Sequence, residues 1–286
     1  MGSLNRAHLK GFLTEDPKPF AMHNDSEMIV INVTTCRRDI PTYVSTQFET
    51  VQVICDIENN KTVAQLLEKL KKYDLVDITG VVNIRPIMRR VTCKFCGMTD
   101  EVIQYANSYI QAQAISKLDN VEAMVGNEHS PEEHLRKHFY EDSHEIIMIG
   151  NVVSNPQLRA LKQSQIPVCG YKIGIDRQYF IKSEPDTTAD YPWIYSYGDM
   201  AVSDFRHLVG ADPKKKELGS LITFRGFAHS RNVEKSITCK CCGHEIPIMK
   251  TITSYIPYSI EYLSNYKTDE DLAREEFYKT RGFEFE

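Results

Sequence analysis

The chain has 286 residues, of which 42% are apolar, and a formal net charge of −5 with histidine neutral. This length fits one large domain or two ordinary domains whose cores need no disulfide support. No run approaches the roughly 18 apolar residues of a membrane span, and the N-terminus lacks the succession of charged, apolar and small residues that marks a signal peptide. We therefore expect a soluble, cytoplasmic protein.

The negative charge is concentrated in two segments. Residues 119–145 hold 2 basic and 8 acidic side chains, and residues 264–286 hold 4 and 7. The rest of the chain holds 28 basic and 24 acidic side chains, a net charge of +4. The acidic total therefore does not exclude a polyanionic ligand such as a nucleic acid.

The first part of the chain predicts short strands and a single helix. The helix is expected at 62–73, where apolar residues recur at helical spacing. The strands are marked by β-branched residues and by turn residues such as those of Thr14–Pro17. We expect them at 9–13, 28–35, 50–55, 75–85 and 103–118.

The same order returns later in the chain. Its strands are expected at 146–153, 168–175, 193–197, 221–231 and 251–263, with a helix at 200–208. The hexad Thr92–Gly97 returns as Thr238–Gly243, and this offset of 146 residues also carries Ser108-Tyr109-Ile110 onto Ser254-Tyr255-Ile256. We infer a duplication with one repeat in 1–118 and another in 144–263.

Five strands with a helix between the third and the fourth is the order of an OB-fold barrel. The sequence thus predicts a mainly β protein with two tandem five-stranded OB-fold barrels, with an SH3-like or other small barrel as the alternative. A charged, partly helical linker at 119–143 should separate them, with a helix start at Ser130-Pro131. An acidic, partly helical tail is expected at 264–286.

Each repeat also carries a Cys-x-x-Cys knuckle, at 93–96 and at 239–242. Paired cysteines in a reducing compartment indicate a metal site, and zinc takes four such ligands. We expect Cys93, Cys96, Cys239 and Cys242 to share one structural Zn²⁺ that clamps the repeats. Knuckles exchanged between two chains, a ligand role for His244 or Cys241, and redox-active dithiols are the alternatives. Three further cysteines in apolar contexts are expected to be buried: Cys36, Cys55 and Cys169.

Several motifs resemble the bacterial-type single-stranded-DNA-binding protein family. They are the opening strand and turn at 5–17, Arg38 and Arg177 after the second strands, Gly80–Arg85 as a fourth strand, and Tyr258–Leu263 as a closing strand. The resemblance implies binding of single-stranded DNA without strong sequence preference in replication, recombination or DNA transfer. Because that family assembles four OB-folds, it also implies a homodimer. The tip Phe283–Glu286 is similar to the tail through which that family recruits replication or recombination proteins; a frayed terminus is the alternative.

Binding a single strand requires cations for the phosphates and flat side chains on which bases stack. Alternation along 193–197 places all three aromatic residues on one face, and by the resemblance Tyr197 falls where a stacking tryptophan stands. We expect the second repeat to supply most of the stacking and the first mostly phosphate contacts. The candidate nucleic-acid-binding residues are Arg37, Arg38, Tyr43, Phe48, Arg85, Arg89, Arg90, Arg177, Tyr179, Phe180, Trp193, Tyr195, Tyr197, Arg225, Phe227 and Arg231.

No motif in the sequence indicates an enzyme. There is no glycine-rich phosphate loop, no His-Glu-x-x-His helix and no nucleophile elbow. Two other functions remain open on the sequence: an RNA-binding OB protein, and a zinc-stabilised interaction subunit of a replication complex.

Overall fold

The computed structural model describes residues 4–21, 27–38, 47–56, 61–120, 130–177, 186–212, 214–215 and 217–280. Its first half contains β1 (Leu4–Leu13), β2 (Lys18–Ala21), β3 (Glu27–Cys36), β4 (Phe48–Asp56), α1 (Lys61–Leu67), β5 (Asp74–Thr92) and β6 (Thr99–Asn120). Helix α3 (Pro131–His138) follows. The second half contains β7 (His144–Val152), β8 (Gln157–Ala160), β9 (Pro167–Asp176), β10 (Ala189–Asp190), β11 (Trp193–Tyr197), α4 (Gly198–His207), β12 (Leu221–Thr238), β13 (Glu245–Ser264) and α5 (Asp269–Thr280).

Strands of the first half close a five-stranded barrel. β1 pairs with both β3 and β5, β3 pairs with β4, β4 runs parallel to β6, and β6 returns to β5. Helix α1 lies between the third and fourth barrel strands and buries Val63 and Leu67. The mainly β fold with an OB-type barrel that the sequence predicted is confirmed in this half.

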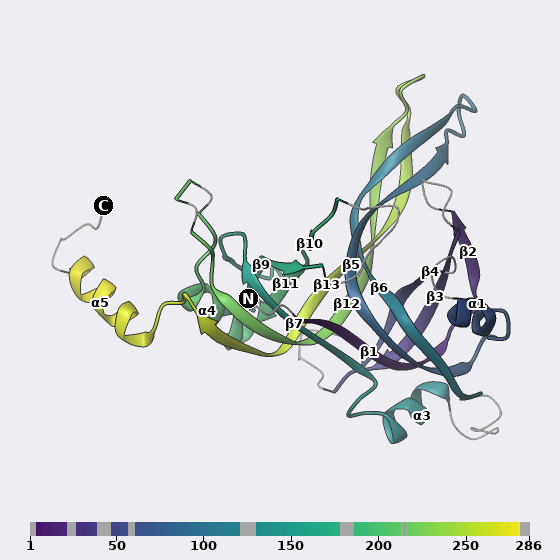
Figure 1. Ribbon diagram of the computed structural model, residues 1–286. Helices are drawn as coiled ribbons and strands as arrows, with labels where there is room; N and C mark the ends of the chain where they lie inside the picture. Colours follow the sequence, from purple (N-terminus) through teal and green to yellow (C-terminus); the bar gives the residue numbers. More distant parts are fainter. Residues whose placement is uncertain are drawn as a thin grey trace.

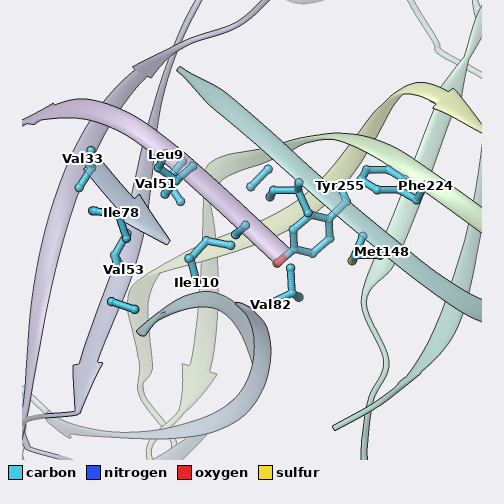
Figure 2. Packing of buried hydrophobic residues seen from close by; sticks show 14 of the residues in the cluster. Leu9, Val33, Val51, Val53, Ile78, Val82, Ile110, Met148, Phe224 and Tyr255 are labelled. Carbon is cyan, nitrogen blue, oxygen red and sulfur yellow. The ribbon is translucent and has the colours of Figure 1, made fainter. Parts of the chain in front are cut away.

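The strands of the second half pair in the corresponding order. β7 pairs with β9 and β12, β9 with β11, β12 with β13, and β11 runs parallel to β13. An antiparallel pairing of β1 with β7, Leu4–Leu9 against His144–Ile149, joins the two halves into one sheet. One apolar cluster therefore continues from Leu9 and Val53 in the first half to Phe224 and Tyr255 in the second (Figure 2).

The two copies of the Ser-Tyr-Ile motif do not occupy equivalent positions. Ile110 pairs in parallel with Val53, whereas Tyr255 pairs with Ile194, at the corresponding point of the second half. An irregularity between Arg85 and Ile87 accounts for this, because the facing stretch of β6 contains one extra residue. A shift of one residue turns a side chain to the other face of the sheet. Tyr255 therefore lies in the main core, while Tyr109 lies in a separate cluster.

The ends of the β5–β6 and β12–β13 hairpins extend from the body of the molecule and run side by side to neighbouring tips (Figure 1). We call this pair of hairpin ends the stalk. Val91, Ile237 and Ile246 pack between the hairpins close to the tips. The stalk thus brings together two turns that are 146 residues apart in the sequence.

Two further helices, α3 and α5, differ in how they pack. Ser130 caps α3, accepting a hydrogen bond from the Glu133 N–H, and Leu135 packs this helix against Phe12 and Leu75. Helix α5 buries none of its residues and projects from the body of the molecule (Figure 1). Among the described helices, none is long and apolar enough to cross a membrane.

Candidate nucleic-acid interface and metal centre

The outward face of β11 carries three aromatic rings in a row. Ile194 and Ser196 point inward and are fully buried, so strand alternation turns Trp193, Tyr195 and Tyr197 outward. Trp193 is 39% exposed, and its ring stacks on Tyr195 with centroids 5.8 Å apart and planes inclined by 13°. We call these three residues the aromatic ladder.

Cations from the neighbouring strands lie against the aromatic ladder. Lys172 of β9 places its Nζ 5.0 Å from the Trp193 ring centroid, and Arg159 of β8 places its Cζ 5.6 Å from that of Tyr195. Both separations allow cation–π attraction. Partial burial raises the pKa of Tyr197, and the nearby Arg231 and Arg159 oppose that rise. Cationic side chains and flat aromatic faces therefore adjoin on one surface.

Sequence reasoning missed Arg159 and Lys172. They belong to other strands, and only the register shows that Lys172 pairs directly with Trp193 and that β8 pairs with β9. The available signal was the alternation of β9, which places Lys172 on the face opposite to Tyr171 and Ile173 of the core.

A glycine beneath the ladder fixes the position of one ring. Gly170 pairs with Tyr195, and a Cβ atom at Gly170 would lie 2.7 Å from the Tyr195 Cε1 atom. A side chain at this position would therefore displace the ring. The absence of a side chain lets Tyr195 lie flat over the backbone of β9.

Four of the predicted nucleic-acid-binding residues lie in the interior instead of on the surface. Arg177 Nη2 contacts Asp190 Oδ1 at 2.6 Å, and Arg37 Nε lies 3.5 Å from Glu49 Oε1. In each repeat, the arginine that follows the second barrel strand thus pairs with a carboxylate close to the start of the third barrel strand. Three of the four, Arg37, Arg85 and Phe227, are fully buried, and the side chain of the fourth, Arg177, is buried as well.

The two arginine–carboxylate pairs connect the repeats. Arg177 Nη2 donates to Asn83 Oδ1 at 3.3 Å, and Asp190 Oδ1 accepts from the Ile84 N–H at 3.0 Å. In the other direction, Glu49 Oε1 lies 2.8 Å from His229 Nδ1. Asn83 and His229 are separated by the 146-residue offset, so each repeat contacts the same place on the other.

Other predicted residues are engaged by acids or packed in small clusters. Glu145 Oε1 lies 2.5 Å from Arg225 Nη2 and 3.5 Å from Arg38 Nη2. Phe48 is half-buried against the cluster around Phe12. Arg231 is exposed on β12 near Tyr197. Tyr43, Tyr179 and Phe180 lie outside the described residues; Arg89 and Arg90 belong to β5, and their side chains lie outside the described part.

The stalk tips bring four cysteines together. The Sγ atoms of Cys93, Cys96, Cys239 and Cys242 all lie within 4.8 Å of one another. The contacts across the hairpins measure 3.7 Å for Cys93 with Cys242 and 3.6 Å for Cys96 with Cys239. A tetrahedral Zn²⁺ with Zn–S bonds near 2.3 Å separates its sulfurs by about 3.8 Å. The four thiols therefore fit one metal ion within a single chain.

The two knuckles have the same backbone geometry. Gly97 and Gly243 both have φ of +72°, in the left-handed region that favours glycine. Each donates its N–H to the carbonyl of the first cysteine at 2.9 Å. N–H groups of Cys96 and Phe95 lower the pKa of Cys93 to about 7, whereas burial and the neighbouring sulfurs raise the pKa of Cys96, so Cys93 is the more easily ionised of these two thiols.

Neither alternative ligand belongs to the four-sulfur group. The His244 ring stacks on Phe95 with centroids 4.4 Å apart and planes inclined by 4°, and Cys241 is exposed. Cys36, Cys55 and Cys169 are buried, as predicted, and burial raises their pKa values to about 11, 12 and 12.

Comparison with known proteins agrees with this architecture. No protein-family model matches the chain, and no curated protein matches its sequence. Wild-type single-stranded DNA binding protein from Thermus aquaticus matches in structure with a TM-score of 0.52 and 12% identity, covering 94% of this chain and 97% of that one. A deletion mutant of the same protein matches with the same TM-score and identity, over 94% and 98%. A Plasmodium falciparum SSB in complex with ssDNA matches with a TM-score of 0.29 and 18% identity, over 42% and 94%.

The two Thermus aquaticus matches identify the fold. The chain has the OB-type fold of single-stranded-DNA-binding proteins, so the resemblance seen in the sequence motifs is confirmed at this level. Among the proteins compared, the Thermus aquaticus protein shares this fold over nearly its whole length.

Proposed function

We propose that the chain is a tandem pair of OB-fold barrels that binds single-stranded DNA without strong sequence preference. The observation that carries the proposal is the aromatic ladder with Lys172 and Arg159 against its rings. Corresponding strand pairings in the two halves support the tandem arrangement. The fold shared with single-stranded-DNA-binding proteins supports the choice of ligand.

The ladder can bind a strand without reading its sequence. Every base has a flat face, and each base stacked on an aromatic side chain contributes about 1–3 kcal/mol. Lys172, Arg159 and Arg231 would pair with the phosphates, which are the same at every nucleotide. A short run of bases stacked over Trp193, Tyr195 and Tyr197 should therefore bind with moderate affinity and strong salt dependence.

We also propose that the four cysteines hold one structural Zn²⁺. Cys93 and Cys96 would supply two thiolates from the first hairpin, and Cys239 and Cys242 two from the second. A zinc with four protein ligands has no open position for water, so it stabilises structure and does not activate a nucleophile. The metal would hold the two hairpin tips together, and no catalytic step is part of this function.

In the cell, such a protein would protect or deliver single strands during replication, recombination or DNA transfer. This role fits a cytoplasmic protein and a homodimer of two-barrel chains, and we include both in the proposal. Its protein partners would be replication or recombination proteins, and they would bind through the C-terminal tail.

The sole tryptophan allows a direct test. Trp193 is the only one in the chain, so quenching of its fluorescence by oligo(dT) reports on the proposed site. In a second assay, anisotropy of a labelled oligo(dT) is measured with a variant in which Trp193, Tyr195 and Tyr197 are all alanine. We expect a loss of at least a hundredfold in affinity, because up to three stacked bases lose their support.

The controls separate this function from its rivals. Phe277→Ala removes an exposed aromatic of α5 and should leave affinity unchanged. Tighter binding of oligo(U) than of oligo(dT) would favour an RNA-binding protein. Unchanged affinity in the folded triple variant, or no salt-sensitive binding by the wild type, would overturn the proposal and favour an interaction subunit.

A further inference from the structure

We infer that the chain holds a single strand on its second repeat alone, and that the matching face of the first repeat has been rebuilt so that it binds none. This inference rests on the proposed function and concerns how many binding sites one chain offers. It follows from comparing the two repeats at positions that the strand register makes equivalent.

Val53 and Ile194 define the equivalence. Val53 pairs with Ile31 on one side and in parallel with Ile110 on the other. Ile194 pairs with Tyr171 and in parallel with Tyr255 in the same way. Counting along β4 and β11 from these two residues identifies the first-repeat positions that are equivalent to those of the aromatic ladder. Trp193, Tyr195 and Tyr197 correspond to Gln52, Ile54 and Asp56.

None of these three residues can support a base as the ladder does. Gln52 and Asp56 have no ring, and the carboxylate of Asp56 repels phosphate. Ile54 is 1% exposed and packs with Met28 and Tyr109 in a cluster of its own. Tyr109 is an aromatic residue of this face, and it is buried because of the one-residue shift in β6.

The register positions of Lys172 and Arg231 hold no exposed cation in the first repeat. Lys172 pairs with Trp193, and its counterpart Asn32 pairs with Gln52. Arg231 is exposed, whereas its counterpart Arg85, 146 residues earlier, is fully buried.

The remaining parts of the site differ as well. Gln157 pairs with Gly170, and Lys18 pairs with Val30, the counterpart of Gly170, so Lys18 corresponds to Gln157. Two residues further along each strand, Phe20 therefore corresponds to Arg159. The same pairings place Val30 where Gly170 lies beneath Tyr195, so the flat support of the ring is lost too.

The first repeat keeps its half of the reciprocal contacts that join the two repeats. Its β1 pairs with β7, and its β5 receives the Arg177–Asp190 pair at Asn83 and Ile84. Its own carboxylate Glu49 contacts His229 in return. A repeat that provides these contacts supports the second barrel without touching the strand.

One site per chain predicts a particular dependence on oligonucleotide length. An OB-fold covers about 4–16 nucleotides, and beyond that length extra nucleotides only add alternative registers. Two sites joined in one chain would instead act together once the strand could reach both, which raises affinity by about 10²–10⁴-fold. The gain in affinity from two joined sites would therefore be far larger than the few-fold gain from alternative registers on one site.

The test uses the full chain and an oligo(dT) series that extends from a few nucleotides to about 40, well past two OB-fold sites. Matched alanine variants compare equivalent positions: Trp193→Ala with Gln52→Ala, and Tyr197→Ala with Asp56→Ala. We expect the second-repeat variants to lose about 5- to 150-fold in affinity, the value of one stacked base. The first-repeat variants should change by less than about threefold, well below that value. Circular dichroism checks that every variant is folded.

The length series and the stoichiometry then decide. We expect one short oligo(dT) per chain at saturation and, while the strand is too short to reach a second chain, a smooth, few-fold rise in affinity with length. A steep rise at the length that reaches the first barrel, two short strands per chain, or equal losses in the matched variants would overturn the inference while leaving the proposed function intact. Complete absence of binding to every oligonucleotide would instead overturn the proposed function.

Discussion

His144 should make the junction between the repeats sensitive to acid. Its ring is buried, with Nδ1 2.9 Å from Thr35 Oγ1 in the first repeat and Nε2 3.1 Å from the Ala228 nitrogen in the second. The Ala228 N–H can only donate, so Nε2 must be the unprotonated acceptor and Nδ1 carries the proton. Adding a proton to Nε2 would break its contact with Ala228 and so disturb the ring that also contacts Thr35 of the first repeat.

Burial, helped by the nearby Arg37, lowers the pKa of His144 from 6.5 to about 3. Because the pKa is lower in the folded state, the unfolded chain binds more protons below pH 6.5, and stability falls as the pH falls. Between about pH 7.5 and about pH 5, His144 alone should remove about 2 kcal/mol of the free energy of unfolding.

Urea unfolding at the two pH values measures this effect. The wild type is compared with His144→Gln, which lowers stability at both pH values but removes the titrating group. Any release of metal by acid affects both proteins and cancels in the difference. We expect the wild type to lose about 2 kcal/mol more than the variant. Equal losses in the two proteins would refute the assignment of this pH dependence to His144. As a control, His138→Gln, at an exposed position of α3, should behave like the wild type.

Three further predictions test the metal centre, the ladder and the repeat contacts. Elemental analysis should find one zinc per chain, and Cys239→Ser or a strong chelator should lower the melting temperature; no change on chelation would argue against a metal clamp. Gly170→Ala should displace the Tyr195 ring and weaken oligo(dT) binding about tenfold, the value of one stacked base, with an unchanged circular dichroism spectrum; wild-type affinity would show that the ring position is unimportant. Arg177→Met should cost about 3–5 kcal/mol in urea unfolding, because it leaves the Asp190 carboxylate buried without its partner. Adding Asp190→Asn should restore part of that loss, and failure to do so would show that charge is not the cause.

The sequence predicted the fold because its signals were local and repeated. Alternation within 193–197 was enough to place Trp193, Tyr195 and Tyr197 on one face, since a strand has a period of two. The 146-residue spacing of the knuckles indicated that the cysteines belong together. Their approach to within 4.8 Å depends on two long hairpins running side by side, which spacing alone does not show.

The arginines show why the site was harder to predict. An arginine at the end of a strand can meet phosphate or a carboxylate of its own chain, and residue type does not distinguish the two. For Arg37 and Arg177 the partner stands 12 or 13 residues further along, at Glu49 and Asp190. An acid at the same place before the third strand of both repeats was the available signal.

The comparison of the repeats suggests which features the duplicated architecture itself requires. The arginine–carboxylate pairs, Arg37 with Glu49 and Arg177 with Asp190, occur in both copies and contact the opposite repeat. The cysteine knuckles likewise occur in both copies, and each supplies two of the four thiols that lie together at the stalk tips. The aromatic ladder occurs in one copy only. Contacts between the repeats need a contribution from each repeat, whereas one exposed face is enough to bind a strand, so the two kinds of site need not be duplicated together.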